Sequence, residues 1–80
     1  MWEKTPEGLK REYKFADFAE ALNFVNKIGE LAEEANHHPD IELGWGYVRI
    51  TLISHDKGEI TERDHEMAAK IEKLVGLISE

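Results

Sequence analysis

Apolar and polar side chains alternate along three stretches of this chain, as they do in strands with one buried face. These stretches are residues 9–15, 41–45 and 48–53, of which the last has the strongest pattern, and Gly44-Trp45-Gly46 lies where the second ends. Because a glycine-rich segment permits a tight reversal, the last two stretches predict a β-hairpin.

Two further stretches have apolar side chains at steps of three and four, which is the spacing of one face of a helix. The second of them is residues 67–78. In the first, the apolar stripe consists of Phe18, Ala21, Leu22, Val25, Ile28 and Ala32. Both stretches predict an amphipathic helix that lies on an apolar surface.

Capping residues predict where the two helices begin and end. Asp17 can accept hydrogen bonds from the free amides of the first helix, and Thr61 with Asp64 three residues later marks the start of the second. Pro39 disfavours helical dihedrals in the residue before it and cannot itself continue a helix. The first helix should therefore end around residues 35–37.

The predicted order of elements is β-β-α-β-β-α, although the first five residues, ahead of the Pro6-Glu7-Gly8 turn, are short and have an ambiguous pattern. Two amphipathic helices and an antiparallel sheet of up to four strands predict a two-layer α+β fold with both helices packed on one face. No repeat or linker interrupts the chain, so we expect residues 1–80 to form a single domain. Side chains on the other face, such as Tyr47 and Arg49, are mixed, which leaves part of that face or an edge strand available to another subunit.

Composition and charge exclude several classes of function. The chain has 17 acidic and 10 basic residues, a net charge of −7, and its basic residues are scattered, which argues against nucleic acid or an anionic membrane as a partner. Without cysteine there is no disulfide and no thiolate site. The sequence has no signal-peptide pattern and no segment of roughly 18 apolar residues, so we expect a cytoplasmic protein. A chain of 80 residues has a thin core, and a shared interface would help it, so we expect a homo-oligomer.

Three of the four histidines fall where predicted elements end. His37 and His38 follow the first helix, and His55 follows the strand of residues 48–53. Because imidazole titrates close to neutral pH, a cluster of three suits acid–base catalysis. Glu33 lies four residues before His37, one helical turn away, and can orient its ring if the helix persists that far.

The same residues also have plainer interpretations. His37 and His38 can be a surface cap of the helix, and His55 can be a turn residue bonded to Asp56. The histidines and Glu33 could also supply ligands to a metal, but neighbouring residues in an extended chain point to opposite sides. We therefore expect no metal site.

One set of residues along the chain has the order and spacing of a family signature. Its members are Glu33, His37-His38-Pro39, Trp45, His55 and Asp64. This set resembles the signature of the pterin-4a-carbinolamine dehydratase family. The resemblance also includes residues 13–18 and 50–59, and so extends over nearly the whole chain.

The resemblance implies an enzyme that removes water from 4a-hydroxytetrahydropterins to give the quinonoid dihydropterin, without a metal or redox cofactor. It implies that His37, His38 and His55 are catalytic and bind the reduced pterin. It also implies that Asn36, Ser54 and Asp56 contact the substrate beside them. Glu33 and Asp64 are expected to contact the histidines and orient them without touching the substrate.

Two other functions remain as alternatives. One is a non-catalytic dimerisation or protein-binding module of the same fold, because animal members of the family also serve as dimerisation cofactors of a transcription factor. From those members we carry over only oligomerisation, to a homodimer or homotetramer. The other alternative is a small metalloprotein.

Overall fold

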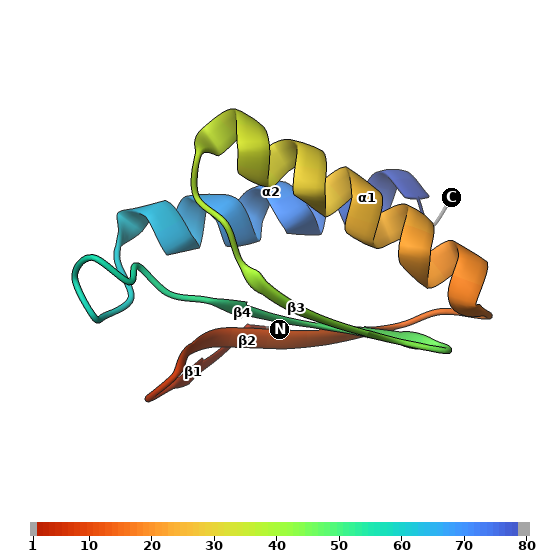
Figure 1. The fold of residues 1–80 in the computed structure, drawn as a ribbon, viewed down its shortest axis with the longest axis horizontal. Coiled ribbons are helices and arrows are strands. Elements are labelled where there is room, and N and C mark those ends of the chain that lie inside the picture. Colours follow the sequence, from red (N-terminus) through yellow and green to blue (C-terminus); the bar gives the residue numbers. More distant parts are fainter. Residues whose placement is uncertain (1, 79–80) are drawn as a thin grey trace.

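The computed structural model describes residues 2–78, without the side chain of Ile78, and folds into four strands and two helices (Figure 1). In chain order these are β1 (Glu3–Thr5), β2 (Gly8–Lys14), α1 (Phe18–Ala35), β3 (Asp40–Gly44), β4 (Tyr47–Leu52) and α2 (Glu62–Ile78). The predicted order and the two-layer α+β fold are confirmed. Met1, Ser79 and Glu80, which the predicted domain includes, and the Ile78 side chain lie outside the described residues.

The strands form one antiparallel sheet in the order β1-β2-β4-β3. Leu9 pairs with Leu52 where β2 lies against β4, and the predicted hairpin joins β3 to β4. Strand β3 lies at an edge of the sheet, and its first residue, Asp40, pairs with Thr51. This register brings the segment after α1 next to the end of β4, which is where the predicted histidines fall.

Both helices lie on the same face of the sheet, and the core fills the space between the layers (Figure 1). Tyr13 of β2 packs edge-on against Phe24 of α1, with ring centroids 5.2 Å apart. The largest fully buried apolar side chains are Phe24, Ile28, Val48, Ile50, Leu52, Met67 and Ile71. Three of these side chains, Val48, Ile50 and Leu52, belong to β4 and are buried together because every second side chain of a strand points to the same face.

The buried stripe of α1 differs from the predicted one. Ala21, Phe24, Ile28 and Ala32 face the core, whereas Phe18 and Leu22 are 44% and 40% exposed. Ala21, Phe24, Ile28 and Ala32 follow one another at steps of three and four and so form a single ridge. Phe18 and Leu22 lie on the flank of that ridge.

Local capping sets both ends of α1. The Asp17 side chain accepts a hydrogen bond from the Glu20 amide at 2.9 Å, as the sequence predicts. At the other end, Asn36 adopts a left-handed conformation with φ of 52°, and its amide bonds back to the last turn. The helix ends at Ala35, within the predicted range, and the chain then turns toward β3.

Candidate active site

A buried carboxylate joins the two segments that contain the predicted catalytic histidines. Asp64 lies in the first turn of α2 and is fully buried. Its Oδ1 lies 2.6 Å from His37 Nε2, and its Oδ2 accepts a hydrogen bond from the Ser54 hydroxyl at 2.8 Å. Because Ser54 directly precedes His55, the Asp64 side chain holds the end of β4 beside the end of α1.

The local structure of α2 explains how Asp64 comes to lie there. Thr61 directly precedes the helix, and its backbone N–H donates to Asp64 Oδ2 at 2.9 Å. This is the reciprocal half of a capping box. Burial alone would raise the pKa of the Asp64 carboxyl, but the hydrogen bonds from the Thr61 amide, His37 and Ser54 outweigh it, and the pKa is lowered. The site therefore contains a buried carboxylate anion that accepts three hydrogen bonds.

Glu33 contacts a different histidine from the one predicted. His38 Nε2 lies 2.5 Å from Glu33 Oε2, whereas His37 turns to Asp64. The prediction that Glu33 pairs with His37 assumed that the helix continues to residue 37, and it is wrong because α1 ends at Ala35. The pair that forms is on the surface, with side-chain exposures of 54% for His38 and 80% for Glu33.

His55 also has a partner that the sequence interpretation missed. Its Nε2 lies 3.8 Å from Asp40 Oδ2, and both side chains are more than 70% exposed. The turn interpretation, in which His55 bonds to Asp56, is not what the structure has. Asp56 instead accepts a hydrogen bond from Arg63 at 2.6 Å, which lowers the pKa of the Asp56 carboxyl. The strand pairing of Asp40 with Thr51 was the missing information, because it places Asp40 near the end of β4.

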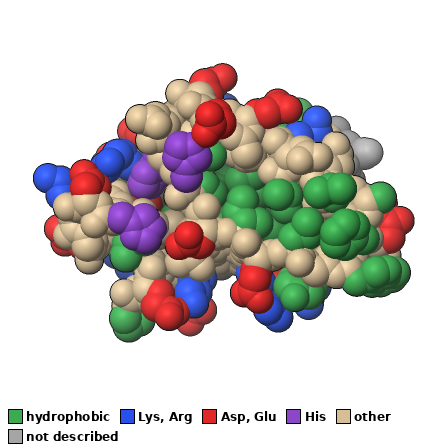
Figure 2. All heavy atoms as spheres, viewed as in Figure 1, with side chains coloured by type: hydrophobic (Ala, Val, Ile, Leu, Met, Phe, Trp, Pro, Cys, Tyr) green, Lys and Arg blue, Asp and Glu red, His purple; other side chains and the backbone are tan. Residues whose placement is uncertain are grey.

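The predicted site residues therefore gather at one end of the sheet, but at different depths. His37 is 10% exposed, whereas His38 and His55 are 54% and 72% exposed. Figure 2 shows histidine side chains together at one end of a face, next to a broad apolar area. Of the remaining predicted residues, Asn36 and Asp56 are exposed and Ser54 is fully buried.

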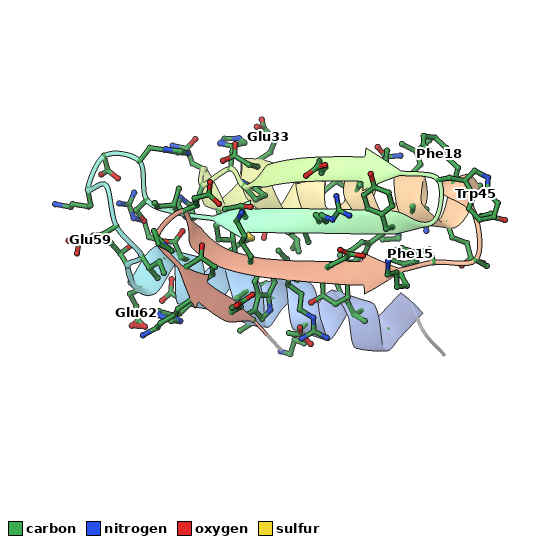
Figure 3. All side chains as sticks on the ribbon, turned by 90° about the horizontal axis from the view of Figure 1, so that it is seen from below. Phe15, Phe18, Glu33, Trp45, Glu59 and Glu62 are labelled. Atoms are coloured by element: carbon green, nitrogen blue, oxygen red, sulfur yellow. The ribbon has the colours of Figure 1, made fainter. Side chains whose placement is uncertain are left out.

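Trp45, the aromatic member of the signature, does not join this group. It lies in the β3–β4 turn, and Figure 3 places it with Phe15 and Phe18 at the opposite end of the molecule from Glu59. Its side chain is 71% exposed. The separation between Trp45 and the histidines follows from the length of β4, because the strand begins after Trp45 and ends before His55.

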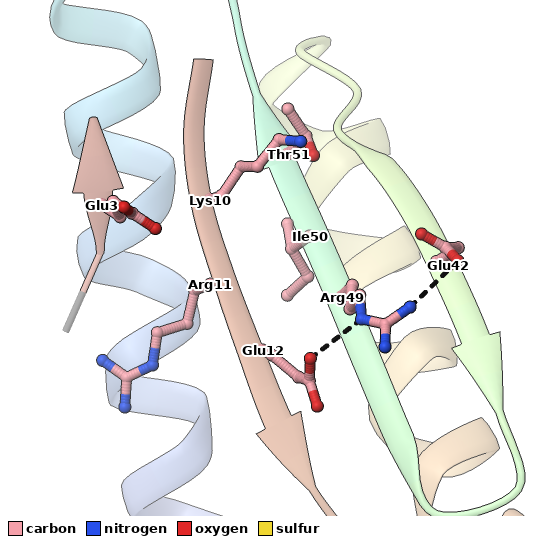
Figure 4. A pocket seen from close by; sticks show the side chains of 8 residues that line it. All are labelled: Glu3, Lys10, Arg11, Glu12, Glu42, Arg49, Ile50 and Thr51. Atoms are coloured by element: carbon pink, nitrogen blue, oxygen red, sulfur yellow. Dashed lines mark hydrogen bonds and ion pairs between the residues drawn. The ribbon is translucent and has the colours of Figure 1, made fainter. Parts of the chain in front are cut away.

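A separate hollow of about 500 Å³ lies on the open face of the sheet (Figure 4). Its lining residues are Glu3, Lys10, Arg11, Glu12, Glu42, Arg49, Ile50 and Thr51. Arg49 is held between Glu12 at 2.8 Å and Glu42 at 3.3 Å. Because no histidine lines this hollow and its central cation is already paired with two carboxylates, it does not extend the histidine site.

A metal site would need several acidic or histidine side chains that converge on one point. Within residues 2–78, no three His, Asp or Glu side chains are grouped so that they could hold an ion.

Neither described helix is long and apolar enough to cross a membrane.

Comparisons with known proteins agree on one family. A family model described as "Pterin 4 alpha carbinolamine dehydratase" matches residues 1–74. A curated protein of Rubrobacter xylanophilus named "Putative pterin-4-alpha-carbinolamine dehydratase" is 51% identical over 74 residues, or 91% of this chain and 69% of that protein. The crystal structure of a transcriptional coactivator/pterin dehydratase from Brucella Melitensis is 34% identical with a TM-score of 0.84, covering 90% of this chain and 79% of that one. A pterin dehydratase-like protein identified as a RuBisCO assembly factor in the alpha-carboxysome is 28% identical with a TM-score of 0.76, covering 95% and 88%.

Proposed function

Since the chain belongs to the pterin-4-alpha-carbinolamine dehydratase family, we propose that it is a dehydratase that removes water from a 4a-hydroxytetrahydropterin to give the quinonoid dihydropterin. The observation that supports this most is the pairing of His37 with the buried Asp64 carboxylate, 2.6 Å away. His38 and His55 lie at the ends of the same two segments. Three imidazoles from two parts of the chain are thus available at one end of the sheet.

The proposed reaction needs one acid and one base. The C4a–O bond breaks and the hydroxyl leaves as water after receiving a proton. Loss of the N5 proton lets the nitrogen electron pair form the new C4a–N5 double bond. We assign proton exchange with the hydroxyl to His37 or His55, according to which face of the pterin carries it, and we assign His38 to holding and polarising the pterin. No electron enters or leaves, so the proposal requires no redox cofactor, and it assigns the proton transfers to histidines rather than to a metal.

The residues around the histidines have supporting roles in this proposal. Asn36 and Asp56 are exposed beside the histidines and are our candidates for substrate contacts, whereas the predicted contact Ser54 is fully buried and is not among them. Asp64 orients His37, and Glu33 orients His38 through the surface pair at 2.5 Å. The two orienting carboxylates differ in burial, so we expect the Asp64 pair to be the stronger one.

The experiment that tests the proposed function is a stopped-flow assay of 4a-hydroxytetrahydropterin dehydration. The double variant His37→Ala, His55→Ala should lose at least about 10²-fold in turnover, the scale on which acid–base residues contribute. His38→Ala tests the binding role and should raise KM. His65→Ala is the matched control, because this exposed histidine of α2 has no role in the proposal. Near-normal turnover in the double variant would refute these residue roles, and a wild-type protein that does not accelerate dehydration would contradict the function.

We also propose that the chain forms a homodimer or homotetramer and works in the cytoplasm. Large apolar side chains are unusually exposed, namely Phe18 (44%), Leu22 (40%), Trp45 (71%) and Leu77 (78%). Strand β3 is an edge of the sheet and could pair with another chain. Trp45→Ser should lower the sedimentation coefficient if this surface is an interface, and a wild-type protein that sediments as a monomer would contradict the proposal.

A second candidate function is protein binding without catalysis. One structural neighbour is an assembly factor and another is a coactivator, and the exposed apolar surface of this chain would suit such a role. The dehydration assay separates the two functions. A wild-type protein that folds but does not accelerate dehydration would favour the binding module.

A further inference from the structure

The Ser54 hydroxyl lies between two partners rather than at the surface. Ser54 is fully buried, and its Oγ is 2.8 Å from Asp64 Oδ2 and 2.6 Å from Thr61 Oγ1. In this position it has no direct contact to offer a substrate. Its role must be exerted through the groups that it touches.

The directions of these hydrogen bonds follow from the charge of Asp64. A carboxylate anion can only accept, so the single proton of Ser54 points to Asp64 Oδ2, where the bond is assisted by charge. The Thr61 hydroxyl must then donate to Ser54 Oγ. A hydroxyl at the start of a helix usually accepts from an amide of the first turn, so this use of the Thr61 side chain is distinctive.

These bonds determine which oxygen of Asp64 is left for His37. Oδ2 accepts from both Ser54 and the Thr61 amide, which leaves Oδ1 facing His37 Nε2 at 2.6 Å. Because that oxygen can only accept, Nε2 must have the proton. In neutral His37 the other nitrogen, Nδ1, is then the one that can take a proton.

We propose that Thr61 and Ser54 are positioning residues that act through Asp64 to fix His37 as the Nε2–H tautomer, so that Nδ1 is the nitrogen that exchanges a proton with the substrate. The exchange with substrate rests on the proposed dehydratase function, whereas the tautomer does not. Both Ser54 and Asp64 are fully buried, so water cannot replace the Ser54 hydroxyl without a rearrangement.

The test measures the ring nitrogens of His37 directly. In ¹⁵N-histidine-labelled protein, the signal that disappears in His37→Gln belongs to His37, and its two ¹⁵N shifts report which nitrogen has the proton. The wild type should show Nε2–H in the neutral ring. Without the Ser54 hydroxyl, or the Thr61 hydroxyl behind it, the Asp64 carboxylate is no longer held facing His37, so Ser54→Ala and Thr61→Val should shift both nitrogens toward the average of the two tautomers. Thr61→Ser, which keeps the hydroxyl, should restore the wild-type shifts.

Turnover in the dehydration assay gives the second measurement. We expect about a 10-fold fall in Ser54→Ala and Thr61→Val, the size of effect seen when residues that orient a functional histidine are removed. The control is Asp17→Ala, which removes the N-terminal cap of α1, at the opposite end of that helix from His37. It should leave the His37 shifts and the turnover unchanged.

The outcomes distinguish the inference from the function. A wild-type His37 with the proton on Nδ1, or a Ser54→Ala protein with wild-type shifts, would overturn the positioning role. Equal changes in Asp17→Ala would do so as well, since they would mean that any loss of stability moves the ring. If Ser54→Ala does not fold, the Thr61 variants test the positioning role instead. Wild-type His37 shifts in Thr61→Val, or changed shifts in Thr61→Ser, would then overturn it. A wild type without dehydratase activity but with the expected shifts would refute the proposed function and leave the positioning intact.

Discussion

Replacing Asp64 with asparagine removes one charge from the centre of the site without changing its shape. The amide oxygen of the variant has two donors to satisfy at the Oδ2 position, the Ser54 hydroxyl at 2.8 Å and the Thr61 amide at 2.9 Å. Two opposing donors in a buried place are costly, so the amide oxygen should take that position and the NH₂ group should face His37. His37 Nε2 would then have to accept, which forces the proton to Nδ1.

Asp64→Asn should therefore affect both activity and stability. We expect turnover to fall by at least about 10²-fold, because an imidazole held in the wrong tautomer cannot exchange its proton as before. The three hydrogen bonds to the carboxylate are assisted by charge, and each such bond contributes about 1.5–3 kcal/mol. Since the amide keeps all three in weaker form, we expect the free energy of unfolding to fall by about 2 kcal/mol at neutral pH.

The stability difference should depend on pH in a defined direction. The folded protein lowers the pKa of Asp64, so the carboxylate stabilises the fold above its ordinary titration range, and this contribution is lost as the pH falls through the lowered pKa. In urea unfolding, the wild type should thus have a higher free energy of unfolding than Asp64→Asn at pH 7, and this difference should become smaller in acid. Asp17→Asn is the matched control, since asparagine caps helices about as well as aspartate. Wild-type turnover in Asp64→Asn, or a difference that becomes larger in acid, would refute the reasoning.

Three other substitutions test the fold and the surface of the site. Gly8→Ala should cost about 2–3 kcal/mol of unfolding free energy, because Gly8 has φ of 133° and an added Cβ would lie 2.4 Å from the Leu52 carbonyl oxygen; an unchanged urea midpoint would contradict this. Gly29→Ala, within α1 and with nothing within 4 Å of the new methyl group, should instead raise stability by about 0.5–1 kcal/mol, and a loss would contradict the open space described there. Glu33→Gln should change stability by less than about 0.5 kcal/mol, because its pair with His38 is exposed; a larger loss would mean that the pair is more than a surface contact.

The fold could be predicted from local patterns because each element has its own signal. Alternation, helical spacing and the capping residue Asp17 gave the right elements in the right order. The centre of the α1 stripe was not predictable in the same way. Spacing defines an apolar face about 100° wide, and only the neighbouring sheet decides that Phe24 is buried and Phe18 is left at 44% exposure.

The partners of the histidines were harder to predict because they depend on two long-range events. The reversal at Asn36 changes the direction of His37, so its helical neighbour Glu33 reaches His38 instead. Asp64 meets His37 across 27 positions of sequence, and only the packing of α2 against the sheet brings them together. The sequence indicated Asp64 as a helix cap, which it is, and the family resemblance implied that it supports the histidines; that it contacts His37 became visible only in three dimensions.

The burial of Asp64 bears on the choice between an enzyme and a binding module. Burying a carboxylate is unfavourable unless several donors satisfy it, and here the donors are Thr61 just before α2, Ser54 just after β4, and His37. Capping α2 does not require this, because an exposed acidic side chain at the same position could accept the Thr61 amide without the cost of burial. A module that only binds proteins gains nothing from an anion held rigidly behind one imidazole. A catalyst does gain, since the fixed anion selects the tautomer of His37 and stabilises the ring when it accepts a proton. The arrangement therefore favours catalysis, and the Asp64→Asn assay is where the two functions predict different results.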